Sequence, residues 1–218
     1  MASAPERPQR LRLVGGTEAA TRRRSRSAGP TSQLEDGALV ALARDGHVAA
    51  FETLYRRHVG FALNVAVRIQ GNAHDVEDVV HDAFVRAHER LGELRDASLF
   101  RSWLGSIVVR LVRSRLRRRR LLTVLGVGGQ DPVDLDAIAG HDASPEVRAQ
   151  LAQIYALLRT VPADERIAWT LRYVESHRLE VVADLVGCSL ATVKRRISRA
   201  QQYLAEHFVS PYSEDSHE

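Results

Sequence analysis

The chain has 218 residues, of which 44% are hydrophobic and 6% aromatic, enough for a modest aliphatic core in one large domain or two small ones. No segment approaches the ~18 consecutive apolar residues of a membrane-spanning helix, so we expect no direct membrane insertion. The N-terminus lacks the apolar stretch of a secretory signal, and the single cysteine, Cys188, cannot form an internal disulfide. We therefore expect a cytoplasmic protein.

Positive charge is concentrated in two short segments. Residues 1–30 contain seven basic and two acidic residues, and residues 101–120 contain eight arginines and no acid, although the whole chain carries only +4. Such segments favour a polyanionic partner, by attraction and by counterion release. Residues 1–33, which include TRRRSRSAGP, show no apolar period and are predicted to be a disordered basic arm.

Residues 34–122 are predicted to form a compact four-helix domain. A short helix closed by Asp45 precedes a longer one that ends at Gly71. In the third helix, apolar residues recur every three or four positions, and Asp75, Asp78 and Asp82 form an acidic patch on another face. Closely spaced like charges destabilise a helix, which favours a basic partner over a merely solvated face.

The fourth helix is predicted to start after an N-cap at Ser98 and to end in the basic sequence RLVRSRLRRRR. Its arginines at positions 110, 113, 117 and 120 recur every three or four residues and share one side. A basic run is also common at ordinary helix ends, because cations there complement the helix dipole. On spacing alone, Trp103 is more typical of the core than of a base-stacking position.

Residues 123–143 contain four glycines and no sustained period, which is typical of a flexible linker. Residues 144–208 are predicted to form a second helical domain, followed by a tail at 209–218. Its last two helices are joined by LVGCS, in which Gly187 permits a sharp turn and Ser189 caps the final helix. This pattern indicates a helix-turn-helix. The predicted fold is therefore all-α, with two small helical domains.

The final helix carries a basic cluster beside its apolar stripe. The polar residues gather in its N-terminal half and are Thr192, Lys194, Arg195, Arg196 and Arg199. The N-terminal residues of a recognition helix enter the major groove, where basic side chains contact guanine edges or phosphates. The alternative is a solvated basic helix, but the glycine turn, capping serine and basic cluster together favour DNA binding.

The sequence gives little support for metal binding or enzymatic catalysis. His74, His81 and His88 recur every seven residues, but His58 is the only obvious further ligand, so we expect no metal site. Cys188 is expected to be a small buried residue. The sequence shows no nucleophile motif, Gly-rich phosphate loop or paired carboxylates. We therefore expect that the protein is not an enzyme and that it uses no cofactor and no small-molecule substrate.

Taken in order, segments within residues 36–206 resemble the extracytoplasmic-function (ECF) type of bacterial sigma factor, a sigma-70 family group. Three segments resemble its region two: AFETLYRRH, DVEDVVHDAFVRA and LFRSWLGSIVVRLVRSRLRRRR. Two segments resemble its region four: VPADERIAWTLRYVE and VVADLVGCSLATVKRRISRA. The chain departs from the usual pattern at Arg110 and Ser114, in place of asparagine and aspartate, and at His81, in place of glutamine. These departures leave the −10 sequence preference open.

The resemblance implies core RNA polymerase and promoter DNA as partners, and an anti-sigma factor as an inhibitor. The residues it implies for polymerase binding are Asp75, Asp78, Val79, His81 and Asp82. Those for the −10 element are Trp103, Arg110, Arg113 and Arg117. Those for the −35 element are Ser189, Thr192, Lys194, Arg195, Arg196 and Arg199.

Two other functions compete with this interpretation. A freestanding helix-turn-helix regulator would use residues 34–122 for dimerisation or ligand binding, and would bind duplex DNA tightly without polymerase. An interaction module, such as a decoy for an anti-sigma factor, would keep the acidic helix but would not need a basic recognition helix.

Overall fold

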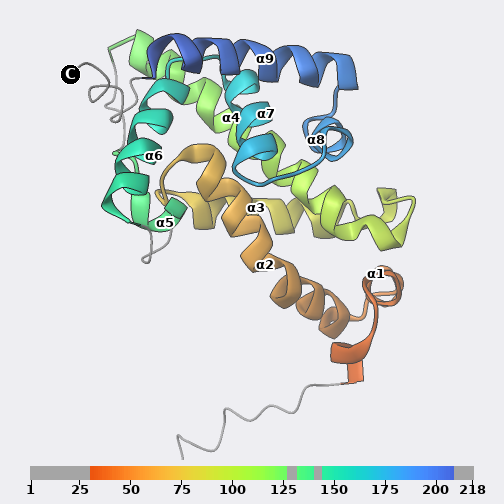
Figure 1. The fold of residues 1–218 in the computed structure, drawn as a ribbon. Coiled ribbons are helices and arrows are strands. Elements are labelled where there is room, and N and C mark those ends of the chain that lie inside the picture. Colours follow the sequence, from red (N-terminus) through yellow and green to blue (C-terminus); the bar gives the residue numbers. More distant parts are fainter. Residues whose placement is uncertain (1–29, 127–131, 140–143, 209–218) are drawn as a thin grey trace, which may run out of the picture.

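The structure is a computed structural model that describes residues 30–126, 132–139 and 144–208. The predicted tail and nearly all of the predicted basic arm lie outside these residues. All regular structure in the described ranges is helical (Figure 1), so the all-α prediction is confirmed. None of the described helices has the length and apolar character needed to cross a membrane.

The first group of helices extends from the short 3-10 helix η2 to the long helix α4. Its members are η2 (Pro30–Gln33), α1 (Asp36–Arg44), α2 (Val48–Gln70), α3 (Val76–Glu89), η3 (Leu91–Glu93), η4 (Ala97–Leu99) and α4 (Phe100–Val124). The apolar stripes predicted for α1, α2 and α3 are buried against α4. α2 ends where predicted because Gly71, with φ of 76°, adopts the left-handed conformation that glycine accepts readily.

The start of α4 differs from the prediction. Ser98 does not cap this helix but lies inside η4, where its N–H donates to Asp96 Oδ1 at 2.9 Å. An aspartate two residues earlier offers the Ser98 backbone a local acceptor, which favours a tight turn before the helix. α4 therefore begins at Phe100, after Leu99, which makes no side-chain cap.

The second group comprises α5 (Leu135–Ala139), α6 (Pro145–Leu158), α7 (Ala163–Tyr173), α8 (Leu179–Val186) and α9 (Leu190–His207). α5 lies within the segment predicted as a linker without regular structure. Ser144 caps α6 by accepting from Val147 N at 3.4 Å. Ser189 caps α9 by accepting from Thr192 N at 3.3 Å, and Gly187 makes the left-handed turn between α8 and α9. The predicted helix-turn-helix is formed as expected.

The two groups pack directly against each other. α4 contacts α7 and α8, and in Figure 1 it passes between them and α3. Gly105 permits this approach, because a Cβ at that position would lie only 2.8 Å from Leu185 Cδ2. One hydrophobic cluster consequently extends from the first group into α7, α8 and α9. The two predicted domains therefore share a core in this structure.

Candidate nucleic-acid interface

The exposed face of the recognition helix carries Lys194 and Arg195 near its start. Val193 and Ile197 bury one side of α9 in the core, which turns Lys194 and Arg195 toward solvent. Neither forms an ion pair with any described residue. Both lie in the first half of α9, close to its capped end at Ser189. This is the position from which a recognition helix contacts DNA bases and phosphates.

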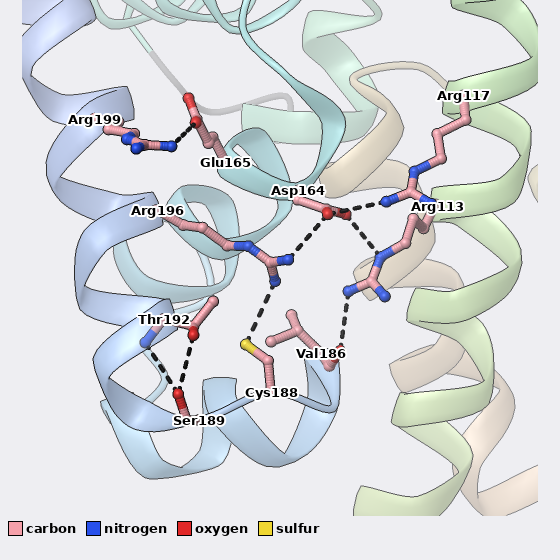
Figure 2. A network of polar contacts seen from close by, with 10 residues as sticks. All are labelled: Arg113, Arg117, Asp164, Glu165, Val186, Cys188, Ser189, Thr192, Arg196 and Arg199. Carbon is pink, nitrogen blue, oxygen red and sulfur yellow. Dashed lines mark hydrogen bonds and ion pairs between the residues drawn. The ribbon is translucent and has the colours of Figure 1, made fainter.

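The other arginines of α9 turn toward α7. Arg196 Nη2 donates to Asp164 Oδ2 at 3.0 Å, and its Nη1 lies 3.4 Å from Cys188 Sγ (Figure 2). Arg199 Nη1 lies 3.6 Å from Glu165 Oε1. Arg196 is therefore largely buried, at 21% exposed, whereas Arg199 remains 64% exposed beside Glu165.

Asp164 also binds two arginines of α4. Arg117 Nη2 donates to Asp164 Oδ2 at 3.0 Å. Arg113 Nε forms an ion pair with Oδ1 at 3.0 Å, without hydrogen-bond alignment, and Arg113 Nη2 donates to Val186 O at 3.0 Å (Figure 2). Burial lowers the pKa of the Arg113 guanidinium even though Asp164 favours its charge. A single carboxylate therefore faces three guanidinium groups.

The remaining predicted −10 residues stay on α4 itself. Arg110 folds back along the helix, where its Nε donates to Ser106 O at 3.2 Å and its Nη2 to Ser106 Oγ at 3.0 Å. Trp103 is half-buried, with its ring 6.1 Å from that of Phe100 between centroids. Arg110 is exposed and can turn outward, whereas Trp103 presents only part of its ring.

The acidic residues around α3 do not form one patch. Asp78, His81 and Asp82 are exposed on α3. Asp75, at the N-cap position, turns toward α4, where its Oδ2 accepts from Arg119 Nη2 at 3.3 Å. Val79 is 0% exposed and belongs to the core, so its side chain is not available to a partner. Asp75 is itself 40% exposed but paired with Arg119, so the exposed members of the predicted polymerase-binding set that form no ion pair with described residues of α4 are Asp78, His81 and Asp82.

Three of the four histidines considered as metal ligands, His58, His74 and His88, have other contacts. His58 Nε2 lies 2.7 Å from Asp36 Oδ2, and the His88 ring packs edge-on against Phe51. Among the described residues, no three His, Cys, Asp or Glu side chains come together in a way that could hold a metal ion.

Asp164 was not predicted as a functional residue. It lies in the first turn of α7, where acidic residues are common because they complement the helix dipole. Its partners lie 47, 51 and 32 residues away in sequence, at Arg117, Arg113 and Arg196. No local pattern indicates such a contact, so only the three-dimensional packing identifies it.

Comparison with known families accounts for both groups of helices. The family model for sigma-70 region 2 matches residues 54–121, and the model for sigma-70 region 4 matches residues 151–204. The chain belongs to the sigma-70 family. This sigma factor is of the ECF type and, as a family member, directs core RNA polymerase to promoter DNA in transcription initiation.

Two relatives match most of this sigma factor. The RNA polymerase sigma-H factor of Pseudomonas aeruginosa is 31% identical over 188 residues, covering 78% of this chain and 92% of that protein. The ECF RNA polymerase sigma-E factor of Escherichia coli K12 is 29% identical over 187 residues, covering 79% and 93%.

Two solved structures have the same fold. CnrH, in complex with the cytosolic domain of CnrY, is 29% identical with a TM-score of 0.53, over 78% of this chain and 95% of that chain. RpoE of Bartonella quintana, in complex with the anti-sigma factor NepR, is 23% identical with a TM-score of 0.56, over 73% and 96%. At 23% identity, the similarity to RpoE shows a shared fold alone.

Proposed function

We propose that this sigma factor contacts core RNA polymerase through the exposed face of α3 and promoter DNA through α4 and α9. The α3 contacts are Asp78, His81 and Asp82. The −10 contacts are Arg110, Arg113 and Arg117, with the exposed part of Trp103. The −35 contacts begin with Lys194 and Arg195. The observation that carries this proposal is the exposure of both cations beside the capped start of the recognition helix.

We further infer that the structure is a closed form that must open before it binds a promoter. Arg113 and Arg117 of the −10 surface and Arg196 of the −35 surface all contact Asp164. The side chains of Arg113 and Arg196 are only 19% and 21% exposed while they face this carboxylate, which leaves them little surface for phosphate contacts. Separation of α4 from α7 therefore precedes full binding to DNA.

Promoter melting requires only a surface that binds unstacked bases better than the duplex. We accordingly expect no enzymatic activity. Because the proposed partners are core RNA polymerase and promoter DNA, we also expect a cytoplasmic location. We also propose an anti-sigma partner, because CnrH is 29% identical and was solved with the cytosolic domain of CnrY. Such a partner would act on a protein whose two DNA-binding surfaces are already held together.

Transcription with reconstituted core polymerase tests the −35 assignment. Replacing Lys194 and Arg195 with alanine removes two contacts of about 1–3 kcal/mol each. We expect at least a ~10-fold loss of transcription from promoters that depend on a −35 element. Co-elution with core polymerase should be unchanged, because α3 is untouched. Gln202→Ala, an exposed change in the second half of α9, is the control.

Two results would contradict this assignment. Unchanged transcription by the double variant would remove Lys194 and Arg195 from the promoter contact. Failure to associate with core polymerase, together with tight binding of duplex DNA by the free protein, would instead favour a freestanding regulator.

A further inference from the structure

A basic pocket lies between the region-two and region-four helices, one to two turns along α4 from the Asp164 contacts. Its volume is about 310 Å³. Four of its lining residues are arginines: Arg119, Arg120, Arg159 and Arg166. None of the described residues that line it is acidic, although Arg119 also reaches Asp75 at 3.3 Å. The pocket therefore has a strong excess of positive charge.

Arg166 is the most deeply placed of these arginines. It is 5% exposed and comes from the first turn of α7. Its Nη2 donates to Gln70 O, but its Nε has no hydrogen-bond acceptor, and it forms no ion pair with any residue that the structure describes. Burial lowers its pKa to about 10, and the charges of Arg159 and Arg119 act in the same direction.

A buried cation without a counterion is costly, because it loses hydration and gains no compensating charge. An anion in the pocket would compensate the Arg166 charge. Arginine is suited to this task, because its planar fork binds phosphate oxygens in pairs.

We propose that this pocket binds a small molecule with a chain of two or more phosphates, of the class of nucleoside di- and triphosphates. Arg120 and Arg166 form no ion pair with any described residue. The other two arginines of the lining add further N–H donors, so the lining offers more donors than a single phosphate would use. Leu116 and Val124 add apolar surface on which a base can rest. The volume also lies at the lower end of the range for small-molecule sites, about 300–1,000 Å³.

The walls of the pocket come from both halves of the molecule. Gln70, Asn72 and the α4 residues belong to the region-two side, whereas Arg159 and Arg166 belong to the region-four side. A ligand that contacts both sides binds the closed form better than an open one, and so shifts the population toward it. This regulatory consequence rests on the proposed function, whereas the binding site itself does not.

Isothermal titration of the full chain with ADP at about 0.15 M salt tests the proposal. We expect saturable binding and at least a ~10-fold weaker affinity for Arg120→Gln and Arg166→Gln. Arg118→Gln is the matched control, because Arg118 is an exposed α4 arginine outside the pocket. Arg120 is also exposed, so its variant is expected to fold even if Arg166→Gln does not.

Inorganic pyrophosphate, titrated separately, distinguishes the phosphate chain from the nucleoside. Tighter binding of ADP than of pyrophosphate supports the full proposal, and equal binding overturns its nucleoside part. An equal loss for Arg118→Gln and Arg120→Gln would identify general attraction of polyanions, and no binding at about 1 mM ADP would also overturn the proposal. These titrations use the free protein, so their failure leaves the transcription test unaffected.

Discussion

Asp164 holds together side chains from three helices. Its two oxygens face Arg113 and Arg117 of α4 and Arg196 of α9, so the local charge remains positive even with the carboxylate present (Figure 2). The three guanidinium groups repel one another, and only this carboxylate compensates the repulsion within the described contacts. This carboxylate therefore stabilises the closed form alongside the hydrophobic core that the two groups share.

Replacing Asp164 with asparagine should weaken the closed form. Because the carboxylate is 21% exposed, we expect a loss of about 1–2 kcal/mol, between the values for surface and buried ion pairs. Urea unfolding measures this loss, and a filter-binding assay should show tighter promoter binding by the free variant. Glu180→Gln, at an exposed acid on α8, is the control. Identical behaviour of the two variants would show that Asp164 does not hold the two halves together.

At the scale of elements, the end of α2 is a second place where the two groups of helices depend on one residue. Gly71 ends this helix with a φ of 76°, and a Cβ there would lie 2.8 Å from Tyr155 Cδ1 and 3.1 Å from Arg166 Nη2. Tyr155 is fully buried, and its hydroxyl donates to Arg68 O at 2.8 Å. The α2–α6 contact thus depends on the absence of a side chain at position 71.

Gly71→Ala should destabilise the protein more than Gly46→Ala. Both glycines have positive φ, but nothing lies within 4 Å of a Cβ at position 46. The backbone strain of about 1 kcal/mol is common to both changes, so the difference measures the contact with α6. We expect an additional loss of about 1–3 kcal/mol from overpacking, read from urea unfolding. Equal losses would mean that Tyr155 moves aside without cost.

The contact between α1 and α2 should respond to pH. Burial lowers the pKa of His58 from 6.5, with Arg57 and Arg101 contributing in the same direction and Asp36 opposing them. The unfolded chain therefore binds a proton more readily than the folded one, and acidification favours unfolding. Stability should fall as the pH decreases through about 6.5 toward the lower folded-state pKa.

Urea unfolding between about pH 7.5 and 5.5 measures this dependence. His58→Gln should reduce the slope of stability against pH, because it removes the group whose pKa burial lowers. His177 contributes a slope of the same sign, because burial also lowers its pKa. A slope that His58→Gln leaves intact would exclude His58 as a main source.

Helical periodicity predicts most elements of this fold, because each helix buries one apolar stripe. It places the end of α2 at Gly71 and the cap of α9 at Ser189. It misses α5, because five residues are too few to display a period. It also misplaces the start of α4, because Ser98 bonds to its neighbour Asp96 instead of capping the helix.

The sequence predicts the candidate site only in part, because local spacing indicates some of its residues and not others. Lys194 and Arg195 stand out because they share a helix and a face. Asp164 and Arg166 gain their importance from partners brought near by folding, such as Arg113 and Gln70. Sequence spacing contains no information about such distant contacts.

At the scale of the whole molecule, the spacing of promoter elements bears on the proposed opening. Two promoter elements about 17 base pairs apart are separated by about 60 Å of DNA. Here α4 packs directly against α7 and α8. The segment 123–143 could extend to about 70 Å if its helical parts unwound. Opening of the α4 interface, as proposed above, is therefore compatible with the chain length.

The distance between the two halves tests this account most directly. We would replace Cys188 with serine, attach fluorophores to cysteines placed at the exposed positions Val48 and Gln202, and record single-molecule energy transfer. The account predicts one population for the free protein and a shift to lower transfer when core polymerase is added. Asp164→Asn should populate the low-transfer state without polymerase. A free protein already in the low-transfer state, or no change on binding polymerase, would contradict the closed form.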